Sequence, residues 1–205
     1  MDPYLSSSKL LVDELNAALQ ELALLGFDLV RLMMSQRPEL SFQLTHRHQA
    51  GYPVLVFGNT KALFPPFLRW LQTQESSSKA LPPHPLDRYV EEQFQQVAKK
   101  LTIDSQLRFA HEMEPAPLPF QEIAAEAGLA ELGPAHLSLR HDTGTWLALR
   151  TTWALDIAST AQLELLQSTI TQSTPVQASC SACAQPCREA LARALAPEKA
   201  SSEEL

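Results

Sequence analysis

Apolar residues recur along the first half of the chain at intervals of three and four, which is the period of an amphipathic helix. This spacing predicts helices over residues 6–25, 61–73 and 86–101. Gly26 would end the first helix, because glycine readily adopts the backbone conformation that follows a helix. Apolar runs with the length of strands lie between and after the helices, and they cover residues 27–34, 54–57 and 104–113.

A second set of elements is expected between Phe120 and Ile157. Residues 121–127 predict a short alanine-rich helix that Gly128 would end. Residues 136–140 and 146–157 alternate apolar side chains and predict two strands. The connection between them, Asp142-Thr143-Gly144, has hairpin length and contains glycine, so the two strands are expected to pair with each other.

Within the second of these strands, Trp146, Ala148 and Arg150 are expected to share one face, because side chains alternate along a strand. The opposite face would carry Leu147, Leu149 and Thr151. An arginine on an otherwise apolar or aromatic face is a place where an anion or a polar ligand can bind. Trp146 and Arg150 are therefore candidate ligand contacts.

The order of the elements predicts the fold class. Helices and strands alternate early, and a hairpin closes the core late, which favours an α+β domain with a mixed sheet and helices on its faces, in three layers. We assign the core to residues 1–158 and a cysteine-containing segment to 159–196. Residues 197–205 have the composition of a disordered tail.

Composition and charge narrow the function classes. Of the 205 residues, 45% are hydrophobic and 19% are charged, as in globular proteins. The net charge of −7 argues against a general nucleic-acid or anionic-membrane partner, since both need a basic face. No apolar run is long enough for a membrane span, and the N-terminus lacks the pattern of a signal peptide, so a cytoplasmic location is expected.

The two glycines after the 121–127 helix carry backbone information. Gly128 would end the helix, and Gly133 would permit a bend or a close approach, so tight helix-to-strand packing is favoured over phosphate binding. No Gly-x-Gly-x-x-Gly follows a strand and no Gly-Lys-Ser/Thr is present, so dinucleotide binding of the usual kind is not expected.

The three cysteines, Cys180, Cys183 and Cys187, give the most specific local signal. They match the second, third and fourth places of a ferredoxin-type run, while Gln177 stands in the first place and Arg188 in place of the final proline. Three thiolates cannot complete a four-cysteine cluster within this run. A zinc site would also need a fourth ligand, for which His46 and His48 qualify by residue type only, so reduced cysteines without metal are the favoured interpretation over a three-cysteine metal site.

Other ionisable residues offer general acid–base chemistry. His111, Glu112 and Glu114 end a predicted strand before a proline-rich turn, where a carboxylate could protonate or orient a substrate. An acidic strand end that faces water is the competing interpretation. His136 follows the Gly133 bend and is either a ligand contact or a partly buried, capped histidine.

The order of these motifs resembles the core of the epoxyqueuosine reductases. The similar segments are the run from Glu114 to Leu129, then Gly133, then Thr145 to Arg150, and then the cysteines. The N-terminal half resembles cobalamin-processing proteins of the cblC type, through Gly26-Phe27, the phenylalanine-containing segment 64–71 and Pro85-Leu86-Asp87. Residues 146–150, Trp-Leu-Ala-Leu-Arg, also look like the Trp-Phe-Ala-Ile-Arg of the cblC type. The resemblance covers roughly residues 8 to 190.

Both families share a nitroreductase-like fold that is adapted to hold cobalamin. The resemblance therefore implies a corrinoid partner, with the corrin over the hairpin and the turn that holds Gly128, Gly133 and His136. Glu114 stands where the reductases have their proposed proton-donating Asp. Since the reductases carry two complete four-iron clusters and this chain has three cysteines, electrons for cobalt would come from an external reductase or thiol.

Three hypotheses follow, in order of preference. The first is binding and processing or trafficking of cobalamin, with reductive removal of the upper axial ligand as an open further step that would make the protein an oxidoreductase. The second is a non-catalytic adaptor or binding module on a nitroreductase-like scaffold, which would act through its proline-rich loops. The third is flavin binding, as in ordinary nitroreductases.

Overall fold

The computed structural model describes residues 3–41, 43–76, 81–170 and 189. Four strands form the central sheet: β1 (Leu29–Ser35), β2 (Tyr52–Asn59), β6 (Ala148–Leu155) and β3 (Ser105–Phe109), in the order β1-β2-β6-β3. Each of these pairings is antiparallel. The centre of β2 is a continuous apolar run, because both faces of this inner strand are covered.

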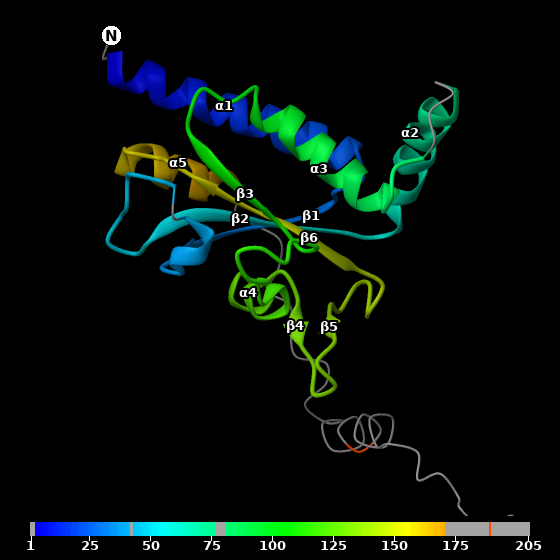
Figure 1. Ribbon diagram of the computed structural model, residues 1–205. Coiled ribbons are helices and arrows are strands. Elements are labelled where there is room, and N and C mark those ends of the chain that lie inside the picture. Colours follow the sequence, from blue (N-terminus) through cyan, green and yellow to red (C-terminus); the bar gives the residue numbers. More distant parts are fainter. Residues whose placement is uncertain (1–2, 42, 77–80, 171–188, 190–205) are drawn as a thin grey trace, which may run out of the picture.

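One face of the sheet is covered by α1 (Pro3–Leu24), α3 (Pro85–Ala98) and α5 (Thr160–Ile170), as Figure 1 shows. Their apolar stripes pack with the side chains of β2 and β6 into one core, in which Leu15, Leu22 and Phe94 are fully buried. The helix α5 follows residue 158, where the sequence analysis ended the core, and its Leu163 and Leu166 belong to the same cluster.

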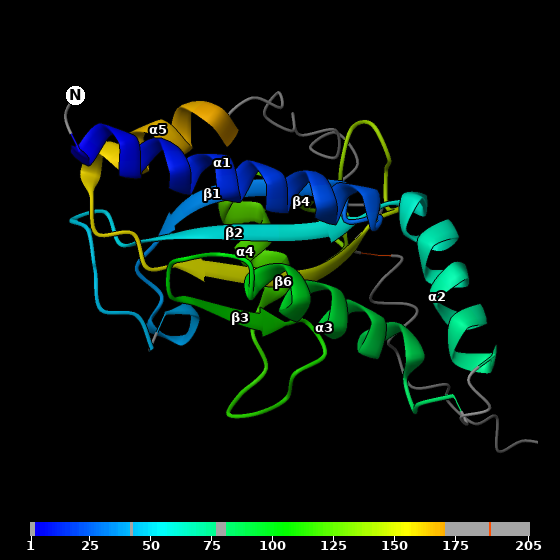
Figure 2. The same ribbon diagram turned by 90° about the horizontal axis from the view of Figure 1, so that it is seen from above.

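A further helix, α2 (Phe64–Ser76), follows the short helical turn η2 (Lys61–Leu63) and extends at one end of the molecule (Figure 2). Pro65 and Pro66 lie in its first turn. The backbone N–H groups of a first turn do not take part in helical hydrogen bonds, so proline is tolerated there. No helix in the described part of the chain is long and apolar enough to cross a membrane.

The opposite face of the sheet carries α4 (Phe120–Glu126), with the turn η1 (Pro38–Leu40) near its edge. Ile123 and Ala124 of α4 are fully buried against Val54 and Val56 of β2. A separate two-stranded hairpin, β4 (Glu131–Leu132) and β5 (Ser138–Leu139), follows α4. Helices, sheet and the α4 unit thus form three layers.

The predicted α+β class with helices on the sheet's faces is confirmed. All the strand runs expected before residue 115 are present, as are the predicted helices. The sheet differs from the prediction in one respect: its described pairings are antiparallel rather than mixed. Antiparallel neighbours that are far apart in sequence need long connections, which the helices α2, α3 and α4 supply.

The predicted hairpin between residues 136–140 and 146–157 is wrong. Residues 138–139 pair instead with 131–132, and β6 pairs with β2 on one side and β3 on the other. Apolar alternation identifies a strand but not its partner, and the fully buried Trp153 and Leu155 require the centre of the sheet rather than an edge hairpin.

The predicted sharing of one face by Trp146 and Arg150 also fails. Trp146 precedes the first residue of β6, and its side chain is 84% exposed. The register between β2 and β6 shifts at Phe57 and Gly58, where Arg150 is the extra residue of a bulge. A bulge interrupts the regular alternation of side chains along a strand. The assignment of residues 146–151 to two alternating faces therefore does not hold.

Candidate ligand-binding site

An open cavity of about 290 Å³ lies where the start of α4, strand β5 and the segment leading into β6 meet. Its lining side chains are Phe120, Gln121, Leu137, Ser138, Thr145, Leu147 and Leu149. These residues belong to three separate segments, 120–121, 137–138 and 145–149, which the fold brings together. Leu147 and Leu149 also pack against the buried cluster around α4, so the cavity floor continues into the core.

The β4–β5 hairpin forms one side of the cavity and is held against α4. The Gly133 N–H donates to the Leu137 carbonyl at 2.8 Å, and the His136 N–H donates to the Gly133 carbonyl at 2.9 Å. Gln121 of α4 donates from its Nε2 to the His136 carbonyl at 2.7 Å. A Cβ atom at Gly133 would lie 2.7 Å from Cδ1 of Leu139 and 3.3 Å from the Leu137 carbonyl oxygen, so a larger residue here would require the Leu139 side chain to move.

The opposite side is a tight turn over residues 140–146. Arg140 and Gly144 exchange two backbone hydrogen bonds of 3.0 and 2.8 Å, and the Trp146 N–H donates to the Thr143 carbonyl. The Arg140 guanidinium binds both oxygens of Asp142, at 2.8 and 2.7 Å, and lowers the pKa of that carboxyl. It also donates from Nη1 to the Leu129 carbonyl at 2.8 Å. The turn is thereby fixed to the end of α4.

The lining combines apolar walls with uncharged polar groups. Phe120 and the three leucines supply apolar walls, while Gln121, Ser138 and Thr145 supply an amide and two hydroxyls. No charged side chain is among the seven lining residues. The Ser138 Oγ is shielded from solvent and has no hydrogen-bond partner in the described part of the chain. Such a hydroxyl is stabilised when a ligand supplies its partner.

Four of the predicted ligand contacts lie in the same stretch of the chain as the cavity lining, between Phe120 and Leu149, although none of them is among the seven lining residues. Gly133 and His136 belong to the hairpin turn, where His136 is exposed and adopts a positive φ of 55°. Trp146 stands between the lining residues Thr145 and Leu147 and projects into solvent. Gly128, with φ of 67°, ends α4 next to Leu129, whose carbonyl holds Arg140. The two glycines therefore have backbone roles: Gly128 follows the end of α4 with a positive φ, and Gly133 lies in the turn between β4 and β5.

Arg150 lies apart from the cavity. Its Nε donates a hydrogen bond to Asn59 Oδ1 at 2.6 Å. The guanidinium is also attracted electrostatically by Asp87 at the start of α3, on the face of the sheet that the helices cover. Burial lowers the pKa of Arg150, and the attraction of Asp87 opposes that change. Arg150 remains a predicted contact that the cavity lining does not include.

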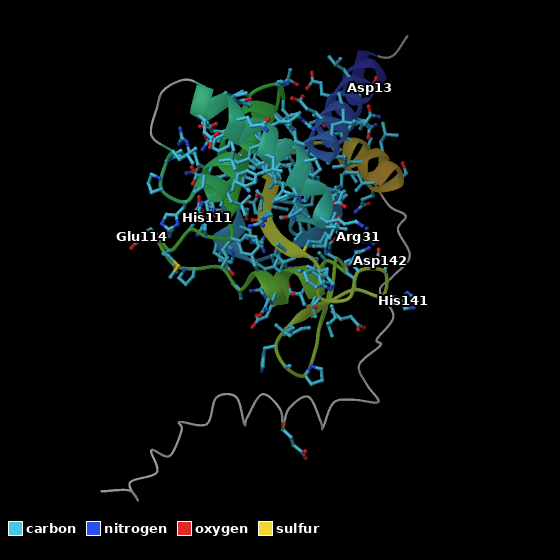
Figure 3. The ribbon with its side chains drawn as sticks, turned by 90° about the vertical axis from the view of Figure 1, so that its right-hand side faces the viewer. Asp13, Arg31, His111, Glu114, His141 and Asp142 are labelled. Carbon is cyan, nitrogen blue, oxygen red and sulfur yellow. The ribbon has the colours of Figure 1, made fainter. Side chains whose placement is uncertain are left out.

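Glu114 also lies apart from the cavity, on an exposed loop between β3 and α4. The buried Arg108 holds this loop by donating to the carbonyls of Glu114 and Ala116, at 3.5 and 3.1 Å. Figure 3 shows Glu114 beside His111, on the opposite side of the view from Arg31 and Asp142. His111 is itself paired with Glu91 at 2.8 Å. The position of Glu114 fits the acidic, water-facing strand end that the sequence also suggested.

The cysteines Cys180, Cys183 and Cys187 lie outside the described residues. Within those residues, no group of three histidine, cysteine or acidic side chains is arranged to hold a metal ion. His46 contacts Asp156 at 3.1 Å, and His48 donates from Nε2 to the Ile157 carbonyl at 2.7 Å. Both histidines therefore have structural partners at the end of β6.

Comparison with solved structures connects this arrangement to a known fold. The chain superimposes on the crystal structure of CblC from C. elegans, described as a B12-trafficking protein and a homologue of human MMACHC. The fold is that of CblC. The TM-score is 0.60, the sequence identity is 15%, and the match covers 92% of this chain and 80% of the CblC chain. No protein-family model matches the chain, and no curated protein matches it.

The likeness to CblC extends over 92% of this chain, so the overall fold is shared. At 15% identity the comparison shows the fold and does not identify a ligand of this chain. The resemblance to the cblC type that the sequence suggested therefore holds at the level of the fold.

Sequence reasoning missed most of the cavity lining. Phe120 and Gln121 look like ordinary first-turn residues of a short helix, and Leu137 and Ser138 lie in a strand assigned to the wrong partner. The one sequence signal for the lining was the alternation of Leu147 and Leu149, which predicts an apolar strand face. The sequence analysis considered the opposite face, with Trp146 and Arg150, for ligand binding.

Proposed function

We propose that this protein binds a corrinoid and takes part in the trafficking or processing of cobalamin. The observation that carries the proposal is the similarity of its fold to a B12-trafficking protein over 92% of the chain. The cavity beside α4 supports it, because its apolar walls and neutral polar groups suit a macrocycle that is apolar across its face and rich in amides at its edge.

The size and shape of the cavity fit part of such a ligand. Its volume of about 290 Å³ is at the low end of small-molecule pockets, so a cobalamin molecule would place one portion inside and lie across the rim. The rim offers two exposed apolar side chains, Trp146 at 84% and Leu137 at 52%. Exposed aromatic and aliphatic groups next to an open cavity are typical of a surface that a ligand covers.

The lining residues would share the work of recognition. Trp146 and Leu137 would contact the apolar surface of the corrinoid, and Gln121, Ser138 and Thr145 would exchange hydrogen bonds with its amides. Reductive removal of an upper axial ligand would need electrons from an external reductase or thiol. Glu114 would serve as the proton donor only if the ligand reaches the loop after β3, since that carboxylate lies outside the cavity lining.

Corrinoid binding is tested by mixing the purified chain with cyanocobalamin or cob(II)alamin and recording the visible spectrum and the thermal unfolding midpoint. We expect a shift of the corrin absorption bands and a higher midpoint, because a ligand that binds only the folded state stabilises it. Absence of both changes would remove the proposal.

The site within the chain is tested with Trp146→Ala. Removing this exposed indole should leave the unfolding midpoint nearly unchanged and weaken corrinoid binding about tenfold or more, as buried aromatic contacts do in interfaces. Leu24→Ala is the matched control, since Leu24 is 80% exposed on α1, away from the cavity. Equal affinities for the two variants would place the ligand elsewhere.

The other two hypotheses predict different outcomes in the same experiments. An adaptor should purify without colour, bind neither corrinoid nor flavin, and tolerate combined substitution of Glu114 and Arg150. A flavin-binding protein should purify with yellow absorbance.

A further inference from the structure

One side chain of the cavity lining, Gln121, is oriented by the hairpin beside it. Its Nε2 donates to the His136 carbonyl at 2.7 Å. A backbone carbonyl accepts hydrogen bonds and donates none, so the nitrogen of the side-chain amide has to face it. This contact joins the first turn of α4 to the turn between β4 and β5, and Figure 1 shows the helix and the hairpin side by side. The orientation of Gln121 is therefore set before a ligand arrives.

The same contact leaves part of the Gln121 amide available to a ligand. The amide keeps its Oε1 acceptor and one N–H donor, and no described residue donates a hydrogen bond to Oε1. The residue is exposed and lines the cavity. A ligand that meets this side chain therefore finds one acceptor and one donor, and neither of them is charged.

The cavity lining offers no positive charge to a ligand. No charged side chain is among its seven residues. Arg140 follows the lining residue Ser138 by two positions, but its side chain is only 10% exposed. Its guanidinium already binds both oxygens of Asp142 and the Leu129 carbonyl. A carboxylate that loses its water in this cavity has no ion pair that would offset the cost.

We propose that Gln121 makes the cavity selective for a primary amide at the edge of its ligand and against a carboxylate at the same position. A primary amide donates to Oε1 and accepts from the remaining N–H, whereas a carboxylate has acceptors only and sets its own oxygen against Oε1. A site built to hydrogen-bond one group discriminates against a close analogue that leaves its polar atoms unpaired. This inference rests on the proposed function, because corrinoids carry primary amides around the macrocycle.

The test compares cyanocobalamin with its three monocarboxylic acids, in which the b, d or e propionamide has become a carboxylate. The propionamides are the longer amide side chains of the corrin edge, so one of them is the group that reaches into the cavity. We expect one acid to bind the full-length protein about tenfold more weakly than cyanocobalamin, and the other two to bind like cyanocobalamin. Titrations followed at the corrin absorption bands measure the four affinities. General repulsion by the net charge of −7 would weaken all three acids alike.

Two variants separate recognition by Gln121 from its support of the hairpin. Gln121→Lys keeps a donor for the His136 carbonyl and brings a positive charge, so it should bind the affected acid at least as tightly as cyanocobalamin. Gln121→Met keeps the length of the side chain without the amide, so it should weaken cyanocobalamin and reduce its advantage over that acid. Gln96→Met, at an exposed position of α3, is the matched control and should bind all four ligands like the unaltered chain. Thermal unfolding checks that each variant is folded.

The outcomes separate this selectivity from corrinoid binding itself. Equal affinities for the three acids, whether the same as that of cyanocobalamin or lower, would overturn the selectivity and leave the proposed function standing. A loss for one acid that Gln121→Lys does not reverse would overturn the role of Gln121. If cyanocobalamin itself does not bind, the proposed function falls and the selectivity falls with it.

Discussion

At the end of β6, the carboxylate of Asp156 holds the loop that precedes β2. It accepts hydrogen bonds from Thr45 Oγ1 at 2.8 Å and from the backbone N–H groups of Thr45 and His46, at 3.3 and 2.7 Å. Its side chain is 6% exposed. Burial raises the pKa of Asp156, but the hydrogen bonds from His46 and Thr45 outweigh burial, so the pKa lies below its ordinary value.

We predict that Asp156→Asn destabilises the fold by about 2 kcal/mol at pH 7, because the amide nitrogen cannot accept these bonds. A carboxyl with a lowered folded-state pKa contributes stability that is present above its unfolded pKa of about 3.9 and is lost as the pH falls through the folded-state value. The difference between the variant and the unaltered chain should therefore shrink below about pH 4. Urea unfolding across this pH range measures it.

Asp104→Asn is the control for that experiment, since Asp104 is exposed and contacts Asp156 through its backbone carbonyl only. A pH-independent difference for Asp156→Asn would show that the loop is held by packing and not by the carboxylate charge.

Among the elements, α5 shows how a helix outside the sheet completes the core. Leu166 is fully buried in the cluster of α1 and α3, whereas its neighbour Leu165 is 39% exposed. We predict that Leu166→Ala lowers the free energy of unfolding by about 3 kcal/mol, because it leaves a cavity in a packed core. Leu165→Ala should change it by less than about 0.5 kcal/mol. Similar losses for both variants in chemical denaturation would mean that α5 frays as a unit.

The elements also show what the sequence could and could not predict. Periodicity identified α1, α3 and the strand runs, because each buries a face whose spacing is fixed by its own geometry. It could not identify the partners of β6, since β2 and β3 lie about 95 and 45 residues before it and no local signal records that pairing. The bulge at Phe57 and Gly58, which turns Arg150 toward Asn59, was equally invisible.

The candidate site depended on the same long-range pairings. Trp146 was predicted as a ligand contact because it was placed on one strand face with Arg150. It lies between the lining residues Thr145 and Leu147, is exposed, and is not itself among the lining residues. Leu137 and Ser138 were overlooked, because the sequence assigned their strand to the wrong partner. A site whose lining comes from α4, β5 and the segment before β6 can be recognised only once the fold has placed these segments beside one another.

At the scale of the whole molecule, a shared architecture persists at 15% identity because it depends on the pattern of buried positions more than on particular residues. The functional question that the fold leaves open is where electrons come from. A protein that only binds and transfers a corrinoid needs no redox centre of its own, whereas a self-contained reductase does. The three cysteines decide between these two, although they lie outside the described residues.

We predict that the protein made in cells carries no stably bound four-iron cluster. The run Cys180, Cys183, Cys187 matches three places of the ferredoxin-type pattern, and Gln177 occupies the place of the missing ligand. A cluster with one iron lacking a thiolate loses that iron readily, so iron and acid-labile sulfide in anaerobically purified protein should be far below four per chain. Near-stoichiometric values would restore the self-contained reductase. Gln177→Cys should improve cluster retention after anaerobic reconstitution, and if it does not, the three thiols do not surround a cluster cavity and cobalt reduction depends on an external donor.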